Sequence, residues 1–298
     1  MNNLTEKIAS KHLGKKSLGS SVYDSSLLVA VPRSENRIQY NIDNKKLPFE
    51  GYDIWHGYEF SCLTENNIPL TRVLKLKYNC NNEHLIESKS LKLYLNSFNM
   101  SSFGKTISEA LQITKKIIEK DLSEKLETNV EVNFLENNSE RIEIFKDFTN
   151  IMSFVDESKL KVECFKESPE DLRVVEDSSK EYFLTFDSLR SNCRVTHQPD
   201  FGDVFIYYKS KKHIEEGSLV KYLASFRSEN HFHEECCEMI FKRLKDLLDE
   251  KDELFVCALY TRRGGIDICP ARWTKNCNQK ELEKLLDLNC YARYGIKQ

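Results

Sequence analysis

Several features that the 298-residue sequence lacks limit the class of protein to which it can belong. It contains no run of about 18 apolar residues, so no transmembrane helix is expected. Its N-terminal stretch, MNNLTEKIASKHLGKKSLGSS, has no apolar segment of the kind that a secretory signal carries. It has no excess of basic residues, because 44 lysines and arginines face 47 acidic residues, for a net charge of −3. These absences favour a cytoplasmic protein that binds neither a membrane nor nucleic acid directly.

Two common motifs are also missing. None of the ten cysteines falls in a C-x-x-C pair, and most lie within apolar patterns. Reduced thiols therefore fit better than disulfides or a structural zinc site. No G-x-G-x-x-G follows a predicted strand, so a dinucleotide would have to be bound without a Rossmann domain.

The most informative feature that is present is an internal repeat. Residues 87–98, ESKSLKLYLNSF, nearly recur at 215–226 as EEGSLVKYLASF. A repeat of this length indicates one supersecondary unit used twice. Since each half reads roughly as strand, strand, helix, helix and strand, the sequence predicts an α+β fold of two tandem modules, residues 1–150 and 151–298. Each module would be an antiparallel sheet with helices on one face.

The pattern of apolar residues places the elements. Strands are predicted at 52–63, 72–78, 130–134, around Cys193, and at 204–208, 254–260 and 266–273. Helices are predicted at 87–98, from Thr106, at 218–226 and at 231–249, and Thr106 has capping-box spacing to Glu109. The last two strands are expected to pair through RRGG, 262–265. The charged spacer, 150–188, is expected to be a connector with some helix, and the first 25 residues a polar lead-in.

Sheets of this kind have exposed edges and a bare face. Such units commonly manage their edges by pairing or closure with further copies. Two fused modules in each of two chains would complete a barrel-like assembly, which predicts a homodimer.

Chemically distinctive residues lie where the two halves differ. Cys62 and Cys193 each lie 11 residues before a strand valine, which would place the two thiols at equivalent positions. Only Cys193 has an acid seven residues on, Asp200. The second copy of the repeat is followed by residues 232–234, Phe-His-Glu, whereas the first begins with residues 87–89, Glu-Ser-Lys. These complementary differences favour one composite site.

Each of these residues also has a purely structural interpretation. One cysteine among ten is usually a small buried hydrophobe, and Asp200 could be a turn residue. His233 and Glu234 could lie at a helix start, where an acid meets the positive end of the dipole. Lys89 would ordinarily lie on a solvated face.

Taken together the residues allow a sharper hypothesis. A thiol near an acid and an imidazole can become a thiolate nucleophile. Glu87 and Glu234 could each accept paired N–H groups from a guanine-like base, on which Phe232 could stack. Lys89 with Arg262 and Arg263 could bind phosphates, while Gly264 would let the backbone approach them.

Four segments carry a family resemblance: ESKSLKLYLNSFN, SNCRVTHQPDFGD, FRSENHFHE and YTRRGGIDI. In order and spacing, over about residues 50–275, they resemble the NADPH-dependent 7-cyano-7-deazaguanine reductases, the QueF nitrile reductases of queuosine biosynthesis. The chain is most similar to their long, two-module form. That family is similar in fold to the tunnelling-fold enzymes, including GTP cyclohydrolase I, but works without a metal.

The resemblance implies a mechanism and a set of site residues. Cys193 would add to the nitrile carbon as a thiolate to form a thioimide, Asp200 would donate a proton, and two NADPH molecules would deliver two hydrides to give the aminomethyl product. Expected substrate contacts are Ile86, Glu87, Ser88, Phe232, His233 and Glu234. Expected NADPH contacts are Ser88, Lys89, Arg263 and Gly264.

Three other functions are compatible with parts of the sequence. A zinc-dependent, GTP-cyclohydrolase-like enzyme would need a Cys/His ligand set. His197 and His233 are present, but no second thiol lies at ligand spacing near Cys193. A hydrolase could release an acid from the same thioimide, and a binding module without catalysis would have an inert Cys193.

Overall fold

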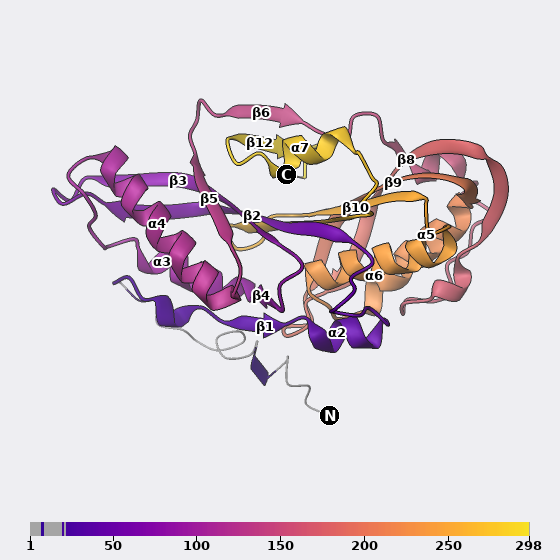
Figure 1. Ribbon diagram of the computed structural model, residues 1–298, viewed down its shortest axis with the longest axis horizontal. Helices are drawn as coiled ribbons and strands as arrows, with labels where there is room; N and C mark the ends of the chain where they lie inside the picture. The colour runs from indigo at the N-terminus through magenta and orange to yellow at the C-terminus, as the bar shows by residue number, and fades with distance from the viewer. Residues whose placement is uncertain (1–6, 9–19, 21, 298) are drawn as a thin grey trace.

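The computed structural model describes residues 7–8, 20 and 22–297, and this part of the chain folds around an eight-stranded sheet (Figure 1). The order of the strands is β5-β3-β2-β11-β10-β9-β8-β7, and every pair is antiparallel except β7 with β8. The strands are β2 (Glu50–Leu63), β3 (Pro69–Asn79), β5 (Val130–Leu135), β7 (Thr149–Asn150), β8 (Val174–Asn192), β9 (Pro199–Ile214), β10 (Glu253–Tyr260) and β11 (Ile266–Trp273). The mixed α+β fold with a largely antiparallel sheet is confirmed.

Four helices cover one face of this sheet (Figure 1). They are α3 (Ser88–Ser97), α4 (Ile107–Leu126), α5 (Glu216–Ser225) and α6 (His233–Leu247). The first two pack on the strands of the first half around Leu74 and Leu76, and the last two pack on those of the second half around Val204 and Ile206. Because β11 pairs with β2, the two halves share one continuous sheet.

Part of the opposite face is covered as well, which differs from the bare face expected from sequence. The covering elements, seen above the sheet in Figure 1, are β6 (Glu140–Glu143), α7 (Lys280–Leu286) and β12 (Cys290–Arg293). Their apolar side chains, with Phe145 and Phe148 from the loop after β6, form a third core against Phe205 and Phe255. Short elements complete the fold: β1 (Ala30–Pro32), α2 (Ser34–Gln39), β4 (His84–Ile86) and the 3-10 turns Ser25–Leu27, Ile151–Phe154, Pro169–Asp171 and Phe226–Ser228.

The residues of the internal repeat make the same structural contacts in both copies. Ser97 and Ser225 each donate a hydrogen bond of 2.6 Å to a backbone carbonyl three residues earlier, that of Tyr94 and Tyr222. The aromatic rings of each copy pack edge to face at centroid distances of 5.3 and 5.5 Å, Tyr94 with Phe98 and Tyr222 with Phe226. The repeat therefore marks a duplicated unit, and its shared residues hold the helix in place.

The strand pairing next to each turn shows that Cys62 and Cys193 are not at equivalent positions, contrary to the prediction from the sequence. Strand β2 pairs Cys62 with Leu70, and β8 pairs Ser191 with Asp200. The position equivalent to Cys62 is therefore Ser191. Cys193 lies beyond the end of β8, in the turn before β9, and not inside a strand as the sequence suggested.

Other predictions had mixed outcomes. Thr106 caps α4 by accepting from the backbone N–H of Glu109 at 3.2 Å, and β10 pairs with β11 through the predicted turn. The predicted connector, 150–188, is correct only in its first part, which contains the 3-10 turns Ile151–Phe154 and Pro169–Asp171, because β8 begins at Val174. Its first residues are mostly exposed on both faces, so they lack the apolar alternation by which a strand is recognised. The predicted polar lead-in lies mostly outside the described residues.

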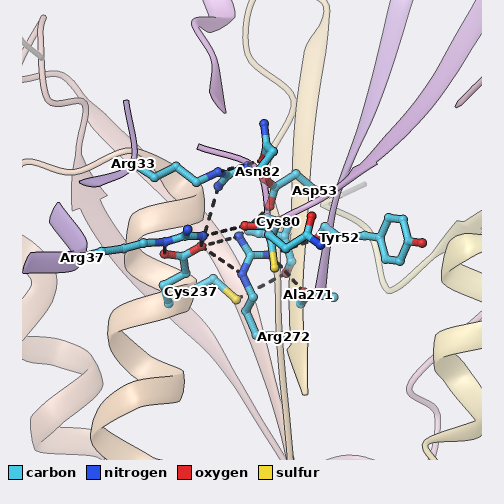
Figure 2. A network of polar contacts seen from close by, with 12 residues as sticks. Arg33, Arg37, Tyr52, Asp53, Cys80, Asn82, Cys237, Ala271 and Arg272 are labelled. Atoms are coloured by element: carbon cyan, nitrogen blue, oxygen red, sulfur yellow. Dashed lines mark hydrogen bonds and ion pairs between the residues drawn. The ribbon is translucent and has the colours of Figure 1, made fainter. Parts of the chain in front are cut away.

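A cluster of five buried charged residues, here called the arginine network, joins distant parts of the chain (Figure 2). It consists of Arg33, Arg37, Asp53, Glu238 and Arg272, each at most 2% exposed. Arg33 and Arg272 donate to Asp53 at 2.5 and 2.8 Å. Arg37 donates twice to Glu238, at 2.7 and 2.8 Å, and Arg272 donates to the same carboxylate at 2.9 Å. The network thus ties the segment before β2 to β2, α6 and β11.

Over the described residues, no helix is long and apolar enough to cross a membrane. All ten cysteines lie among the described residues, and all are unpaired.

Candidate active site

A pocket of about 350 Å³ lies where the two halves meet. Every site residue that the family resemblance implies lines it: Ile86, Glu87, Ser88, Lys89, Cys193, Asp200, Phe232, His233, Glu234, Arg263 and Gly264. The pocket is built from the start of α3, the turn between β8 and β9, the start of α6 and the turn between β10 and β11. The fold therefore brings the expected composite site together.

Cys193 is held at the pocket by its own turn and by the next residue. Its backbone N–H donates to Gln198 O at 2.8 Å, and its carbonyl accepts from His197 N at 2.9 Å. Arg194 forms a buried ion pair with Glu235 at 2.7 Å. Since Glu235 lies in the first turn of α6, this pair fastens the thiol-bearing turn to the helix that carries His233 and Glu234.

Asp200 lies between two groups that favour its ionised form. Arg263 Nη1 donates to Asp200 Oδ1, and His233 Nε2 lies 3.4 Å from Oδ2. Burial alone would raise the pKa of Asp200, but His233 and the Arg263 guanidinium hold it below its usual range. In this arrangement Asp200 is a carboxylate, so a role as proton donor requires that it first receive a proton.

Glu234 is the most unusual acid in the pocket. It is 1% exposed, and neither carboxylate oxygen has a hydrogen-bond partner within residues 22–297. Burial, and after it the charge of Asp53, raises the pKa of Glu234 to about 8, against the opposing effect of Arg33 and Arg272. Leaving such a group unpaired is costly, which is typical of a site built to receive ligand donors.

Glu87 also has a structural role that was not predicted from the sequence. It caps α3, because its two carboxylate oxygens accept from the backbone N–H groups of Lys89 and Ser90 at 2.9 and 2.7 Å. Burial raises the pKa of Glu87, while these two hydrogen bonds act in the opposite direction. A carboxylate has about four acceptor positions, so Glu87 can cap the helix and still accept from a ligand.

The aromatic and imidazole rings at the start of α6 are fixed by packing. His233 stacks on Tyr260 with ring centroids 3.7 Å apart and planes 5° from parallel. Phe232 packs partly buried against Val29, Val31 and Leu85. The rings are therefore positioned before any ligand binds.

Cations gather on one side of the pocket. Lys89 and Arg263 line it as predicted, and Lys92, one turn after Lys89 on α3, joins them. Gly264 has a φ of +60°, which favours glycine, and it provides a turn without a side chain beside Lys92. This collection of positive charge suits an anionic ligand such as a phosphate.

Arg262 corrects the predicted phosphate group. In the described part of the chain, the pocket lining does not include it. Its guanidinium instead lies 4.3 Å from the centroid of the Tyr58 ring. Two consecutive arginines in a tight turn point in different directions, which the letters RRGG could not show.

Sequence reasoning missed seven lining residues: Trp55, Lys92, Thr196, Gln198, His231, Ile266 and Ile268. Trp55 was interpreted as part of a packed aromatic strand, yet its Nε1 is buried without a hydrogen-bond partner in the described residues. Burial disfavours a charge on His231, but Glu229 and Glu235 raise its pKa to about 9. The position of His231 two residues before His233 was the signal that could have identified it.

One group of possible metal ligands occurs in the described residues, and Cys193 is not part of it. His56, Asp267 and Cys269 have ligand atoms within 4.8 Å of one another. None of the three lines the pocket among the described residues, and His56 Nδ1 is hydrogen-bonded to Asp267 at 2.7 Å. A zinc-cyclohydrolase reading, which needs ligands around the reacting thiol, gains no support from this group.

The pocket holds a partly buried thiol, an acid paired with an imidazole, a buried acid whose oxygens have no hydrogen-bond partner in the described residues, and a set of cations. Such a set can attack an electrophilic carbon, deliver protons, hold a base edge and bind a phosphorylated ligand. Such a set is typical of an enzyme with a thiol nucleophile.

Comparison with known proteins agrees with this class. Residues 20–134 match the family model described as "Nitrile reductase, 7-cyano-7-deazaguanine-reductase N-term", and residues 199–280 match that of the "QueF-like protein". The NADPH-dependent 7-cyano-7-deazaguanine reductase of Colwellia psychrerythraea is 37% identical over 275 residues, which is 91% of this chain and 93% of the relative. The enzyme of the same name from Rickettsia felis is 40% identical over 264 residues, 88% of this chain and 92% of the relative. The chain belongs to the QueF family of nitrile reductases.

Proposed function

We propose that this chain reduces 7-cyano-7-deazaguanine to 7-aminomethyl-7-deazaguanine, with NADPH as the hydride donor, in queuosine biosynthesis. The observation that carries the proposal is that one pocket contains both Cys193 and the buried Glu234, whose oxygens have no hydrogen-bond partner in the described residues. The first can react with a nitrile carbon, and the second can recognise the N–H edge of the base. NADPH oxidation that depends on 7-cyano-7-deazaguanine is the direct test.

The proposed reaction needs both a nucleophile and an acid, because a nitrile is a poor hydride acceptor. The Cys193 sulfur adds to the nitrile carbon while the nitrogen takes up a proton, which gives a covalent thioimide. A hydride from NADPH and a proton then reduce the C=N bond of the thioimide. The product is a tetrahedral carbon that bears one hydrogen, an amino group and the Cys193 sulfur. Loss of the Cys193 thiolate leaves an imine, and a second hydride and proton give the amine. The balance is two NADPH and two protons for each nitrile.

We assign the proton deliveries to Asp200 acting with His233. Asp200 is ionised in the structure, and His233 Nε2 is 3.4 Å away. The imidazole can therefore supply the proton that Asp200 passes to the substrate nitrogen. None of these steps requires a metal, so turnover is expected to survive removal of divalent ions by a chelator.

Recognition of the base is assigned to Glu234 and Glu87, with Ile86, Ser88, Phe232 and His233 around the ring. Glu234→Leu should weaken binding of 7-cyano-7-deazaguanine by about 5- to 150-fold, because loss of a buried hydrogen-bonding partner costs about 1–3 kcal/mol. Calorimetric titration measures this. Unchanged affinity would return Glu234 to a role in helix-end electrostatics.

Binding of NADPH is assigned to Ser88, Lys89, Arg263 and Gly264. Lys89→Ala and Arg263→Ala should each raise the KM for NADPH about 10- to 100-fold, since a charge-assisted contact contributes about 1.5–3 kcal/mol. Formation of the thioimide without NADPH should continue in both variants.

The neighbouring arginine provides a matched control for this prediction. Arg262→Ala should leave the KM for NADPH unchanged, because its guanidinium lies over Tyr58, away from the pocket. If Lys89→Ala or Arg263→Ala abolished the adduct itself, those residues would belong to the base pocket or the fold instead.

The wider architecture follows from the same proposal. We assign residues 1–150 and 151–298 to two tunnelling-fold modules, and we propose a cytoplasmic homodimer in which a second chain completes the barrel. In the described part of the chain the sheet is open at both edges, where β5 and the two-residue β7 are the terminal strands. Sedimentation at twice the chain mass of 34.9 kDa would support the dimer.

A further inference from the structure

Glu234 and Glu238 lie one turn apart on α6 and have opposite surroundings. Glu238 belongs to the arginine network and accepts hydrogen bonds from Arg37 and Arg272. Glu234 lines the pocket, and its oxygens have no hydrogen-bond partner in the described residues. The helix thus places the acid assigned to base recognition one turn away from a member of the network.

The network is not electrically balanced. It contains three guanidinium groups and two carboxylates, all buried, so it carries one surplus positive charge (Figure 2). The charged and titratable groups that act on Glu234 come from several elements: Asp53 on β2, Arg33 before α2, Arg272 on β11 and Tyr78 on β3. An ionised Glu234 would bring this buried set to neutrality.

We propose that the arginine network is the charge partner of Glu234, and that binding of a guanine-type base is coupled to release of one proton from Glu234. This inference rests on the proposed function. The network residues act as positioning residues, because they bias the ionisation of Glu234 and do not touch the base.

The direction of the coupling follows from the surroundings of Glu234 in the free protein. With a pKa of about 8, roughly nine tenths of Glu234 holds its proton at pH 7. The N–H donors of a bound base favour the carboxylate, so the pKa falls in the complex and the proton leaves. Binding should therefore release close to one proton at pH 6–7 and about a tenth of one at pH 9. Affinity should rise with pH up to about 8 and then level off.

The test is titration calorimetry of 7-cyano-7-deazaguanine into the full-length Cys193→Ala protein, which cannot form the adduct. Heats measured in two buffers of different ionisation enthalpy give the number of protons exchanged. The expected result at pH 7 is release of most of one proton. The double variant Cys193→Ala, Glu234→Gln should bind more weakly and release none.

A second pair of variants tests the network itself in the same background. Arg33→Gln removes a positive charge, so the pH at which proton release declines should move upward. Arg33→Lys keeps the charge and should restore the profile. Equal shifts in both variants would show that Arg33 acts by packing alone and would overturn the role of the network.

The outcomes separate this inference from the proposed function. Tight binding without proton release at pH 7, or release that persists in the Glu234→Gln variant, overturns the coupling while leaving base recognition intact. Absence of any binding overturns the proposed function, and the inference falls with it. The first measurement does not alter the network, so it holds even if a network variant fails to fold.

Discussion

Replacing Cys193 by alanine should abolish both turnover and covalent adduct formation. The thiol is partly exposed, it lines the pocket, and no other side chain there can form a stable carbon–sulfur bond. Intact-mass spectrometry after incubation with 7-cyano-7-deazaguanine, without NADPH, should show one adduct per chain in the wild type and none in Cys193→Ala.

Cys62→Ala is the matched control for this experiment. Cys62 is fully buried in β2, and burial raises its pKa to about 11, so it stays a thiol at neutral pH. Turnover and the adduct should persist in this variant. An adduct that survives in Cys193→Ala would show that the nucleophile has been assigned wrongly.

Asp200→Ala should reduce turnover by about 10²- to 10⁴-fold, the usual contribution of general acid catalysis, with a much smaller effect on substrate binding. Asp200→Asn should behave similarly, because it keeps a polar partner for Arg263 but cannot carry the proton. Steady-state rates measured beside calorimetric affinities separate the two effects. Near wild-type turnover in both variants would mean that Asp200 is only a turn residue.

Replacement of His233 gives the assignment of Asp200 a second check. Because Arg263 and His233 hold the pKa of Asp200 below its usual range, the free enzyme carries this carboxylate ionised at neutral pH. On the proposed assignment, the proton reaches Asp200 through His233. His233→Ala is therefore expected to slow turnover as well, by a route that leaves Cys193 intact.

The repeat and the turn chemistry made much of the fold predictable. Short sequence patterns predicted the structure correctly where neighbouring residues determine it. Examples are the Thr106 cap of α4 and the two glycines of the turn between β10 and β11. They failed for β8, whose first half is exposed on both faces and so carries no alternation. They also misaligned Cys62 with Cys193 by two residues. One arises because the turn after β8 is one residue longer than the turn after β2, and the other because Val204 matches Leu74 and not Val73.

The sequence predicted which residues line the pocket better than it predicted the contacts that those residues make. Motif order identified residues from four separate segments, and the fold brings them together. Only the three-dimensional structure could show that Arg262 turns away, that Glu87 caps a helix, or that Arg37 reaches Glu238 across 201 residues of sequence. Such contacts depend on the shared sheet, and no local pattern encodes them.

The central claim is reduction of a nitrile, and NADPH oxidation with and without 7-cyano-7-deazaguanine tests it most directly. The account predicts no oxidation without the nitrile and two NADPH consumed for each molecule converted to the aminomethyl product. Consumption of the nitrile with release of the corresponding acid and no loss of NADPH would contradict it, and would identify a hydrolase that uses the same thiol.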